Sequence, residues 1–288
     1  DYVNRFGDTI ESGSDVYSFL TSISAYSYFE NGGDSLLVTR VVSGSYTSAT
    51  SSIIENSNTS ASFTLETIGE GAIMNNTGTE GSAGNLVSGS KDNVRWEIVS
   101  NNTSSGVFTL AIRQGDDVRA KKVNLEVWNN VNLDPNSPRF ISKVIGDQKV
   151  TYNPTNEQLE VSGSYPNASR YVRVKSVDTP TLNYLDNNGV AKSEFTGSIP
   201  VVGSGSFGAA TGDIKAGANF YSDIATQTQG LVAANYTNAI TLHKDIETYK
   251  YNVLSLPGLT DESHSSTIST LITNAEERGD AILVYDTV

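Results

Sequence analysis

The stretch that decides the fold is YNVLSLPGLTDESHSSTISTLITNAEERGDAILVYD, residues 251–286, because its hydrophobic periodicity changes twice. The apolar run 251–256 is typical of a buried strand, and the Pro-Gly pair after it predicts a turn at residues 257–258. Apolar residues at three- and four-residue spacing then predict a helix over residues 266–278, which a glycine ends. The apolar run 281–285 predicts a second strand. Strand, helix and strand of this length indicate a βαβ unit, and hence a parallel sheet with a right-handed crossover.

The N-terminal segment and the region before this stretch have the same mixed character. Residues 14–30 place apolar side chains on one helical face, and the double glycine at 32–33 ends that helix. The run 36–42 has few polar breaks and predicts a mostly buried strand. Residues 219–247 predict one or two helices, with a break near Gly230.

The middle of the chain is different, because short alternating runs recur between clusters of Gly, Asn, Asp and Pro. These runs predict strands at 62–67, 94–100, 107–113, 122–128, 140–145 and 170–177. The polar, glycine-rich run 79–93 predicts a long surface loop. We therefore predict an α+β protein. A discontinuous α/β core domain, residues 1–45 and 205–288 and incomplete at its C-terminus, carries an inserted, mostly antiparallel, sandwich-like β domain, residues 46–204.

Composition excludes several classes of function. The formal net charge of −13 repels phosphate backbones, so we expect no nucleic-acid partner. No apolar run approaches the roughly 18 residues that span a bilayer, so we expect no membrane insertion. The chain has no cysteine, which excludes disulfides, thiolate zinc sites and cysteine nucleophiles.

One glycine-rich motif could bind a dinucleotide. Gly203, Gly205 and Gly208 match G-x-G-x-x-G after an apolar run, and Asp223 follows about 20 residues downstream, where a ribose-binding acid is expected. The segment directly after the glycines is a poor helix start, whereas a pyrophosphate needs a helix N-terminus there. The sequence therefore favours a flexible loop between the domains over a cofactor site.

The run DNNG at residues 186–189 has the look of a calcium loop. If Gly189 took the sixth position of an EF-hand, Tyr184 and Phe195 would take the first and twelfth, and neither can ligate calcium. Asn-Gly favours positive φ, so the run predicts a hairpin turn.

Base catalysis could use only His243 or His264, and both have polar neighbours that predict surface positions. A catalytic triad would combine one of them with Ser255 and Asp286, but the chain has no G-x-S-x-G elbow. Asp286 ends a predicted parallel strand, where ligands often bind, yet a lone acid there more often just ends the strand. We predict no catalytic, cofactor-binding or metal-binding residues and no enzymatic activity.

A basic cluster flanks the acidic pair at residues 116–117. Its members are Arg113, Arg119, Lys121 and Lys122. Two interpretations stay open: a salt-bridged hairpin, or a contact of complementary charge with another subunit.

Four landmarks in order give the chain a resemblance to a known family. They are DYVNRFG (1–7) with YFENGG (28–33) and LVTRVV (37–42); GEGAIMNN (69–76); FTLAIRQG (108–115) through EVWNNVNLDP (126–135) to FISKVIG (140–146); and YNVLSLPG (251–258) with AEER (275–278) and AILVYD (281–286). Their order and spacing resemble the tail sheath proteins of contractile-tailed bacteriophages and related injection machines. That family has an α/β core domain interrupted by a variable β domain, and this chain resembles a compact member.

The resemblance implies a structural role in the virion, with assembly in the host cytoplasm. Sheath subunits form a helical homo-oligomer around an inner tail tube, and a baseplate signal triggers contraction, which drives the tube through the host envelope. The energy lies in two alternative packings of the subunits. The family's terminal arms have no counterpart here. We therefore expect the chain alone to be a monomeric or weakly associating fragment, with an exposed sheet edge or apolar patch after Tyr285.

Two other classes of function stay open. An extracellular β-rich adhesin or surface-layer module would share the richness in Thr, Asn and Gly and the lack of cysteine. An oxidoreductase using the glycines at 203–208 is the weaker alternative.

Overall fold

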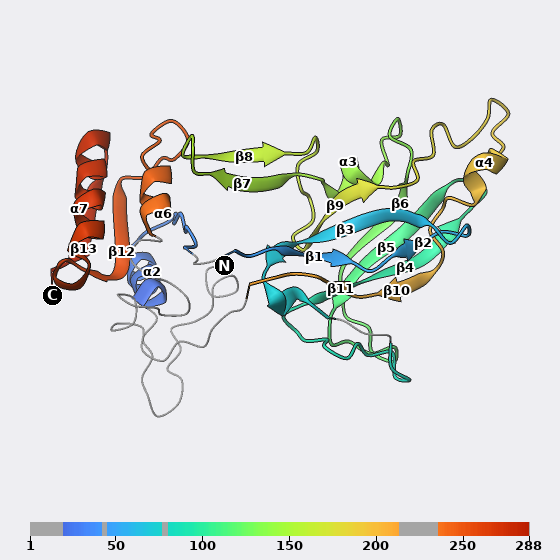
Figure 1. Ribbon diagram of the computed structural model, residues 1–288, viewed down its shortest axis with the longest axis horizontal. Helices are drawn as coiled ribbons and strands as arrows, with labels where there is room; N and C mark the ends of the chain where they lie inside the picture. The colour runs from blue at the N-terminus through green and yellow to red at the C-terminus, as the bar shows by residue number, and fades with distance from the viewer. Residues whose placement is uncertain (1–19, 42–44, 77–79, 213–235, 288) are drawn as a thin grey trace. The chain divides into compact units, whose positions relative to one another are not determined.

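The computed structural model describes residues 20–41, 45–76, 80–212 and 236–287, and the fold is α+β with mostly antiparallel sheets, as predicted (Figure 1). The chain divides into two compact units. Unit 1 comprises Asp1–Gly44, Tyr152–Leu159 and Lys215–Val288, and unit 2 comprises Ser45–Thr151 and Glu160–Ile214. These limits differ from the predicted domains, because residues 152–159 belong to unit 1 and residues 45 and 205–214 belong to unit 2.

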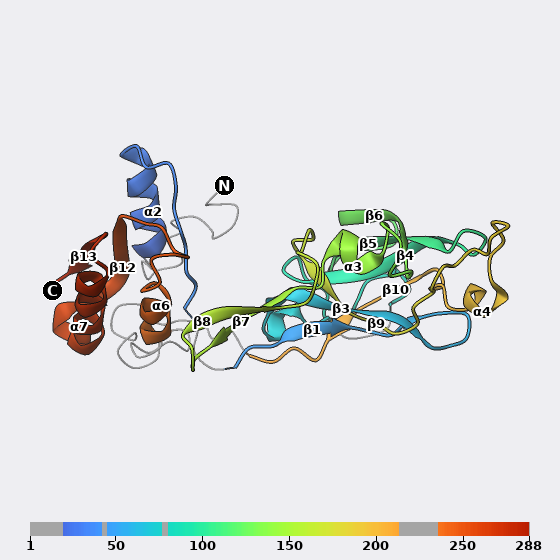
Figure 2. The same ribbon diagram turned by 90° about the horizontal axis from the view of Figure 1, so that it is seen from above.

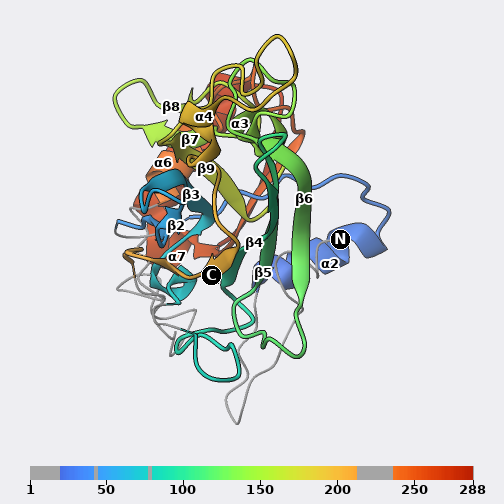
Figure 3. The same cartoon turned by 90° about the vertical axis from the view of Figure 1, so that its right-hand side faces the viewer.

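Unit 2 is built around two antiparallel sheets. The first has the order β11-β1-β3-β2, with β9 also paired to β3: β1 (Ser48–Ser51), β2 (Ile54–Glu55), β3 (Ala61–Glu70), β9 (Val172–Val177) and β11 (Phe207–Gly208). The second has the order β10-β4-β5-β6: β4 (Val94–Asn102), β5 (Val107–Gln114), β6 (Asn124–Asn132) and β10 (Gly203–Gly205). Figure 3 shows β4, β5 and β6 side by side.

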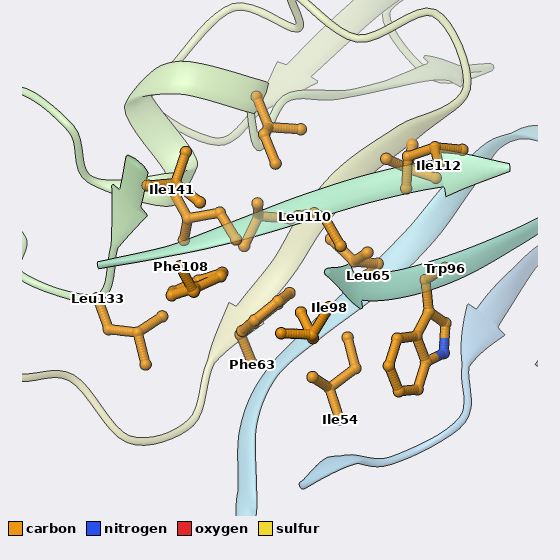
Figure 4. Packing of buried hydrophobic residues seen from close by; sticks show 14 of the residues in the cluster. Ile54, Phe63, Leu65, Trp96, Ile98, Phe108, Leu110, Ile112, Leu133 and Ile141 are labelled. Carbon is orange, nitrogen blue, oxygen red and sulfur yellow. The ribbon is translucent and has the colours of Figure 1, made fainter. Parts of the chain in front are cut away.

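The core of unit 2 lies between these sheets (Figure 4). Phe63 of β3 and Phe108 of β5 stack with their ring centroids 5.5 Å apart. Leu65, Ile98 and Leu110 are fully buried around them. Each such side chain contributes about 1.5–3 kcal/mol through removal of apolar surface from water, so the facing apolar rows hold the two sheets together.

The other elements of unit 2 are short. They are the 3₁₀ helix η1 (Ala72–Met74), the helices α3 (Ile141–Ile145) and α4 (Ser193–Thr196), and the strands β7 (Lys149–Asn153) and β8 (Gln158–Ser162). β7 and β8 form a separate two-stranded sheet. The last residues of β7 and the first residues of β8 belong to unit 1. Four predicted strands correspond to β3, β4, β5 and β9, and the run 122–128 lies partly in β6. The sequence did not indicate β1, β2, β7 or β8, which are short and polar.

Two predictions for unit 2 were wrong. The run 140–145 is the helix α3 and not a strand, because Ile141 and Ile145, one helical turn apart, both point into the core and Gly146 ends the turn at φ +105°. The run 203–208 is not a loop, since β10 pairs with β4 in one sheet and β11 pairs with β1 in the other.

Unit 1 contains α2 (Leu20–Glu30), α6 (Tyr236–Leu242), β12 (Val253–Thr260), α7 (Asp261–Arg278) and β13 (Ile282–Asp286). β12 and β13 pair in parallel, with Val253 opposite Ile282, which confirms the predicted parallel sheet. Figure 2 shows α7 beside this pair, and α7 contacts both strands. Thr260 caps α7 by accepting a hydrogen bond from the Ser263 amide, and Gly279 ends the helix in the left-handed conformation.

Two predictions for unit 1 were wrong. The Pro257–Gly258 pair lies inside β12, where it disturbs the pairing register without turning the chain. Residues 36–41 form no strand, and Leu36 and Leu37 are 41% and 53% exposed, because no described strand lies beside them to complete a ladder. The predicted helices over 14–30 and 219–247 extend outside the described residues, which show α2 and α6.

Candidate functional site

The residues of the hypothetical catalytic triad do not meet. Ser255 of β12 and Asp286 of β13 are exposed, and no hydrogen bond among the described residues joins either of them to a histidine. Nothing in the described part of the chain activates Ser255 as a nucleophile.

The predicted surface positions of both histidines were wrong. His243 is 7% exposed and His264 is 4% exposed. His264 lies at a kink in α7, where its φ of −133° is not helical, and it precedes the apolar stripe of Ile268 and Leu271 by four and seven residues. Its Nδ1 accepts a hydrogen bond of 3.0 Å from the Thr260 amide. Helical spacing relative to that stripe is the signal that could have found it.

The glycine motif serves packing. A side chain at Gly205 would overlap the indole of Trp96, so the residue lets β10 pass close to β4. Residues 209–212 behind the motif are not helical, so the helix N-terminus that a pyrophosphate requires is not directly behind it. Asp223 lies outside the described residues. The motif therefore lacks the helix that a dinucleotide site requires directly behind its glycines.

The DNNG run forms the predicted turn. Gly189 has φ +77°, and its amide donates to the Asp186 carbonyl at 3.0 Å. The Asp186 amide in turn donates to the Val190 carbonyl at 2.8 Å, which closes the hairpin.

The basic cluster resolves into a buried charge network that we call the arginine network: Arg95, Arg113 and Asp117, with Glu80 and Glu97 at its edge. Asp117 binds Arg113 in a bidentate manner, with two nitrogen–oxygen distances of 2.7 Å, and its Oδ1 lies 3.4 Å from Arg95 Nη1. The side chains of Arg95 and Asp117 are fully buried. Such pairs are strongly directional because guanidinium and carboxylate groups are both planar.

The edge of this network reaches the surface. Burial alone would raise the pKa of Glu80, but hydrogen bonds from Ser204 and Arg119 and the charge of Arg95 together lower the pKa below its ordinary value. Glu97 accepts from Arg113 at 3.0 Å and from Lys122 at 2.6 Å. These contacts support the interpretation as internal salt bridges, and a role of the exposed Lys121 in subunit contacts stays a prediction.

The network also fixes two loops against β4 and β5. Arg95 Nη1 donates to the Gly84 carbonyl at 2.6 Å, and Asp117 accepts from the Val123 amide at 3.0 Å. Both carboxylate oxygens of Asp117 are therefore engaged by nitrogen donors. The arginine network therefore has a structural role, because it attaches these two loops to the sheet.

The described ranges hold neither a metal site nor a membrane-spanning helix. Within them, no three acidic or histidine side chains are grouped so that they could hold a metal ion. In that same part of the chain, no helix combines the length and apolar character needed to cross a bilayer.

A scan against models of known protein families finds no match, and a search of curated proteins finds none either.

Proposed function

We propose that this protein is a non-enzymatic structural subunit of a contractile tail sheath. The observation that supports the proposal is the order of the units along the chain. Unit 1, with its parallel β12–β13 pair and α7, takes residues from both ends of the sequence, and the two-sheet unit 2 lies between them in sequence. This is the domain order of the family that the four sequence landmarks resemble.

In this proposal the partners are other sheath subunits, the inner tail tube and the baseplate. Subunits would form a helical array in the virion, and contraction would drive the tube through the host envelope. The work would come from two packings of the same surfaces with different free energies. An apolar surface suited to such contacts is available on the β12–β13 pair, where Val253, Ile282 and Val284 are exposed on one face.

Immunogold electron microscopy tests the proposal. Antibodies raised against the purified chain would be applied to intact cells that produce it and to tail-like particles released from those cells. Regular decoration along contractile tails is the expected result. Particles that stay undecorated, while the chain is present in the same lysate, would overturn the proposal.

A second candidate is an extracellular adhesin or surface-layer module. The observation that favours it is unit 2 itself, a two-sheet antiparallel body of the kind common in cell-surface domains. The same experiment separates the two candidates, because an adhesin would place the gold label on the surface of intact cells.

A further inference from the structure

His243 follows α6 and lies at the centre of a cluster in unit 1. Its ring packs edge-on against Tyr249 and Tyr251, with centroid distances of 5.0 and 5.6 Å. Nε2 lies 2.6 Å from Thr39 Oγ1, while Nδ1 is buried and has no hydrogen-bond partner within the described residues. A neutral imidazole tolerates this arrangement at modest cost, since only one ring nitrogen is left unsatisfied.

Arg278 supplies a fixed positive charge beside this ring. Its side chain is only 1% exposed and lies 4.0 Å above the Tyr251 ring. Nη1 donates to the His243 carbonyl at 2.7 Å, and Nη2 donates to the Tyr249 carbonyl at 2.6 Å. The guanidinium is thus held in place by backbone acceptors and cannot move away from a second cation without breaking them.

Little water can reach the ring. His243, Asn274 and Arg278 line a cavity of about 10 Å³, at the lower limit of what a single water molecule needs. The other lining residues are mostly apolar, among them Ile240 and Leu271. A protonated ring would therefore lose most of its hydration without gaining a carboxylate in return.

His243 binds the segment 33–41 through its hydrogen bond to Thr39. This segment has no helix or strand, and most of its side chains are exposed. In the described part of the chain, two side-chain hydrogen bonds attach it: Tyr28 Oη donates to the Ser35 carbonyl at 2.9 Å, and Thr39 bonds to His243. The Thr39 bond is the one that connects the segment to the end of α6.

We propose that His243 and Thr39 form a proton-sensitive clasp, closed when the ring is neutral and opened when the ring is protonated. The proposal does not depend on the sheath function. Protonation places a second positive charge beside Arg278 in a nearly dry site, and the ring escapes that site only by leaving the cluster. Thr39 is then released with the segment 33–41.

The charged groups around the clasp support this direction. Arg278 faces the ring from α7, and Arg40 follows Thr39 on the segment itself. Asp280 is paired with Arg278 and offsets part of its charge. The remaining charges nearby are the exposed pair of Lys244 with Glu277, the half-buried Asp245, and the exposed Glu247 and Lys250.

The lowered pKa of His243 sets the pH range over which the clasp opens. Burial, and then the charge of Arg278, lower the pKa of His243 below the ordinary value of 6.5. The unfolded or opened ring therefore binds a proton more readily, so the clasp is fully stable above about pH 6.5 and weakens as the pH falls below it. Below the ordinary pKa the opening equilibrium rises as the pH falls, by no more than about ten-fold for each pH unit.

Hydrogen exchange followed by mass spectrometry tests the clasp. Peptides covering 33–41 would be compared at pH 7.5 and 5.5, after correction for the intrinsic exchange rate. We expect weaker protection at pH 5.5 than at pH 7.5 in the wild type, by no more than about ten-fold. His243→Gln should abolish this pH dependence, and His264→Gln, the matched control, should retain it. Thr39→Val should weaken protection at both pH values.

Several results would overturn the proposal. One is equal protection of 33–41 at both pH values in the wild type, and another is a persistent pH response in His243→Gln. Equal loss of protection in α7 at pH 5.5 would show that the unit unfolds as a whole. Proton NMR gives a second test, because the chain has two histidines and His264→Gln leaves only the His243 signal: titration of that signal at or above 6.5 would also refute the clasp.

Discussion

Asp117→Asn removes the charge at the centre of the arginine network and keeps the shape of the side chain. Arg95 and Arg113 lie directly opposite each other on β4 and β5. Like charges in that position repel, and Asp117 is the fully buried carboxylate that contacts both of them. Without its charge, two buried guanidinium groups face each other with only the edge carboxylates Glu80 and Glu97 to offset them.

The expected cost is about 3–5 kcal/mol, the range for breaking a buried ion pair by removing one partner. Both tryptophans of the chain, Trp96 on β4 and Trp128 on β6, belong to unit 2, so their fluorescence reports on the unit that holds the network. With a urea m-value of about 2 kcal/mol/M, the unfolding midpoint should fall by about 1.5–2.5 M.

Asp116→Asn is the matched control. Asp116 is the next residue, is exposed, and accepts a hydrogen bond from Gln114 Nε2 at 2.6 Å. Its substitution should change stability by less than about 0.5 kcal/mol. If Asp117→Asn and Asp116→Asn shift the midpoint equally, the buried charge is not what stabilises this part of unit 2, and the reasoning fails.

Three further substitutions test the packing and the caps. Gly146→Ala should lower the melting temperature of unit 2 far more than Gly189→Ala in a thermal unfolding assay. Both glycines have positive φ, but only at Gly146 would an added Cβ overlap backbone atoms of Asn167. Equal shifts in melting temperature would contradict this reasoning. Phe108→Ala should cost about 3–5 kcal/mol in urea unfolding, since the ring is 1% exposed, and a loss below about 1 kcal/mol would contradict the central position of the aromatic stack. Thr260→Ala removes the cap of α7 and should cost about 1 kcal/mol, read as faster hydrogen exchange in the first turn, whereas Thr260→Ser should restore protection.

Elements whose signal is local were predictable from the sequence. In β12–α7–β13 the apolar runs, the stripe with Ile268 and Leu271, and the stop at Gly279 lie within one short stretch, and each specifies its own element. The long strands of unit 2 were predictable for the same reason. One face of each strand is buried against the other sheet, so apolar and polar residues alternate along its sequence.

Elements that depend on a distant partner were not predictable. Residues 36–41 have the composition of a strand, but a strand exists only where another strand satisfies its amides and carbonyls. Ile141 and Ile145 fit one helical turn as well as a strand, and only the shape of the core decides between them. For His243, the contacts that bury it come from Thr39, Tyr251 and Arg278, whose approach no local pattern indicates.

The arginine network shows where local reasoning ends. Alternation along β4 correctly assigns Trp96 and Arg95 to opposite faces, and it then suggests that the face with the arginine meets water. The glycine-rich run around residues 80–93 covers that face instead: its Leu86 and Asn93 are buried, and its Gly84 carbonyl accepts a hydrogen bond from Arg95. An arginine enclosed in this way needs a carboxylate, which Asp117 provides from a loop 22 residues further along the chain. We therefore expect the stability of unit 2 to depend on the loop that carries Asp117, and removal of the Asp117 charge measures that dependence.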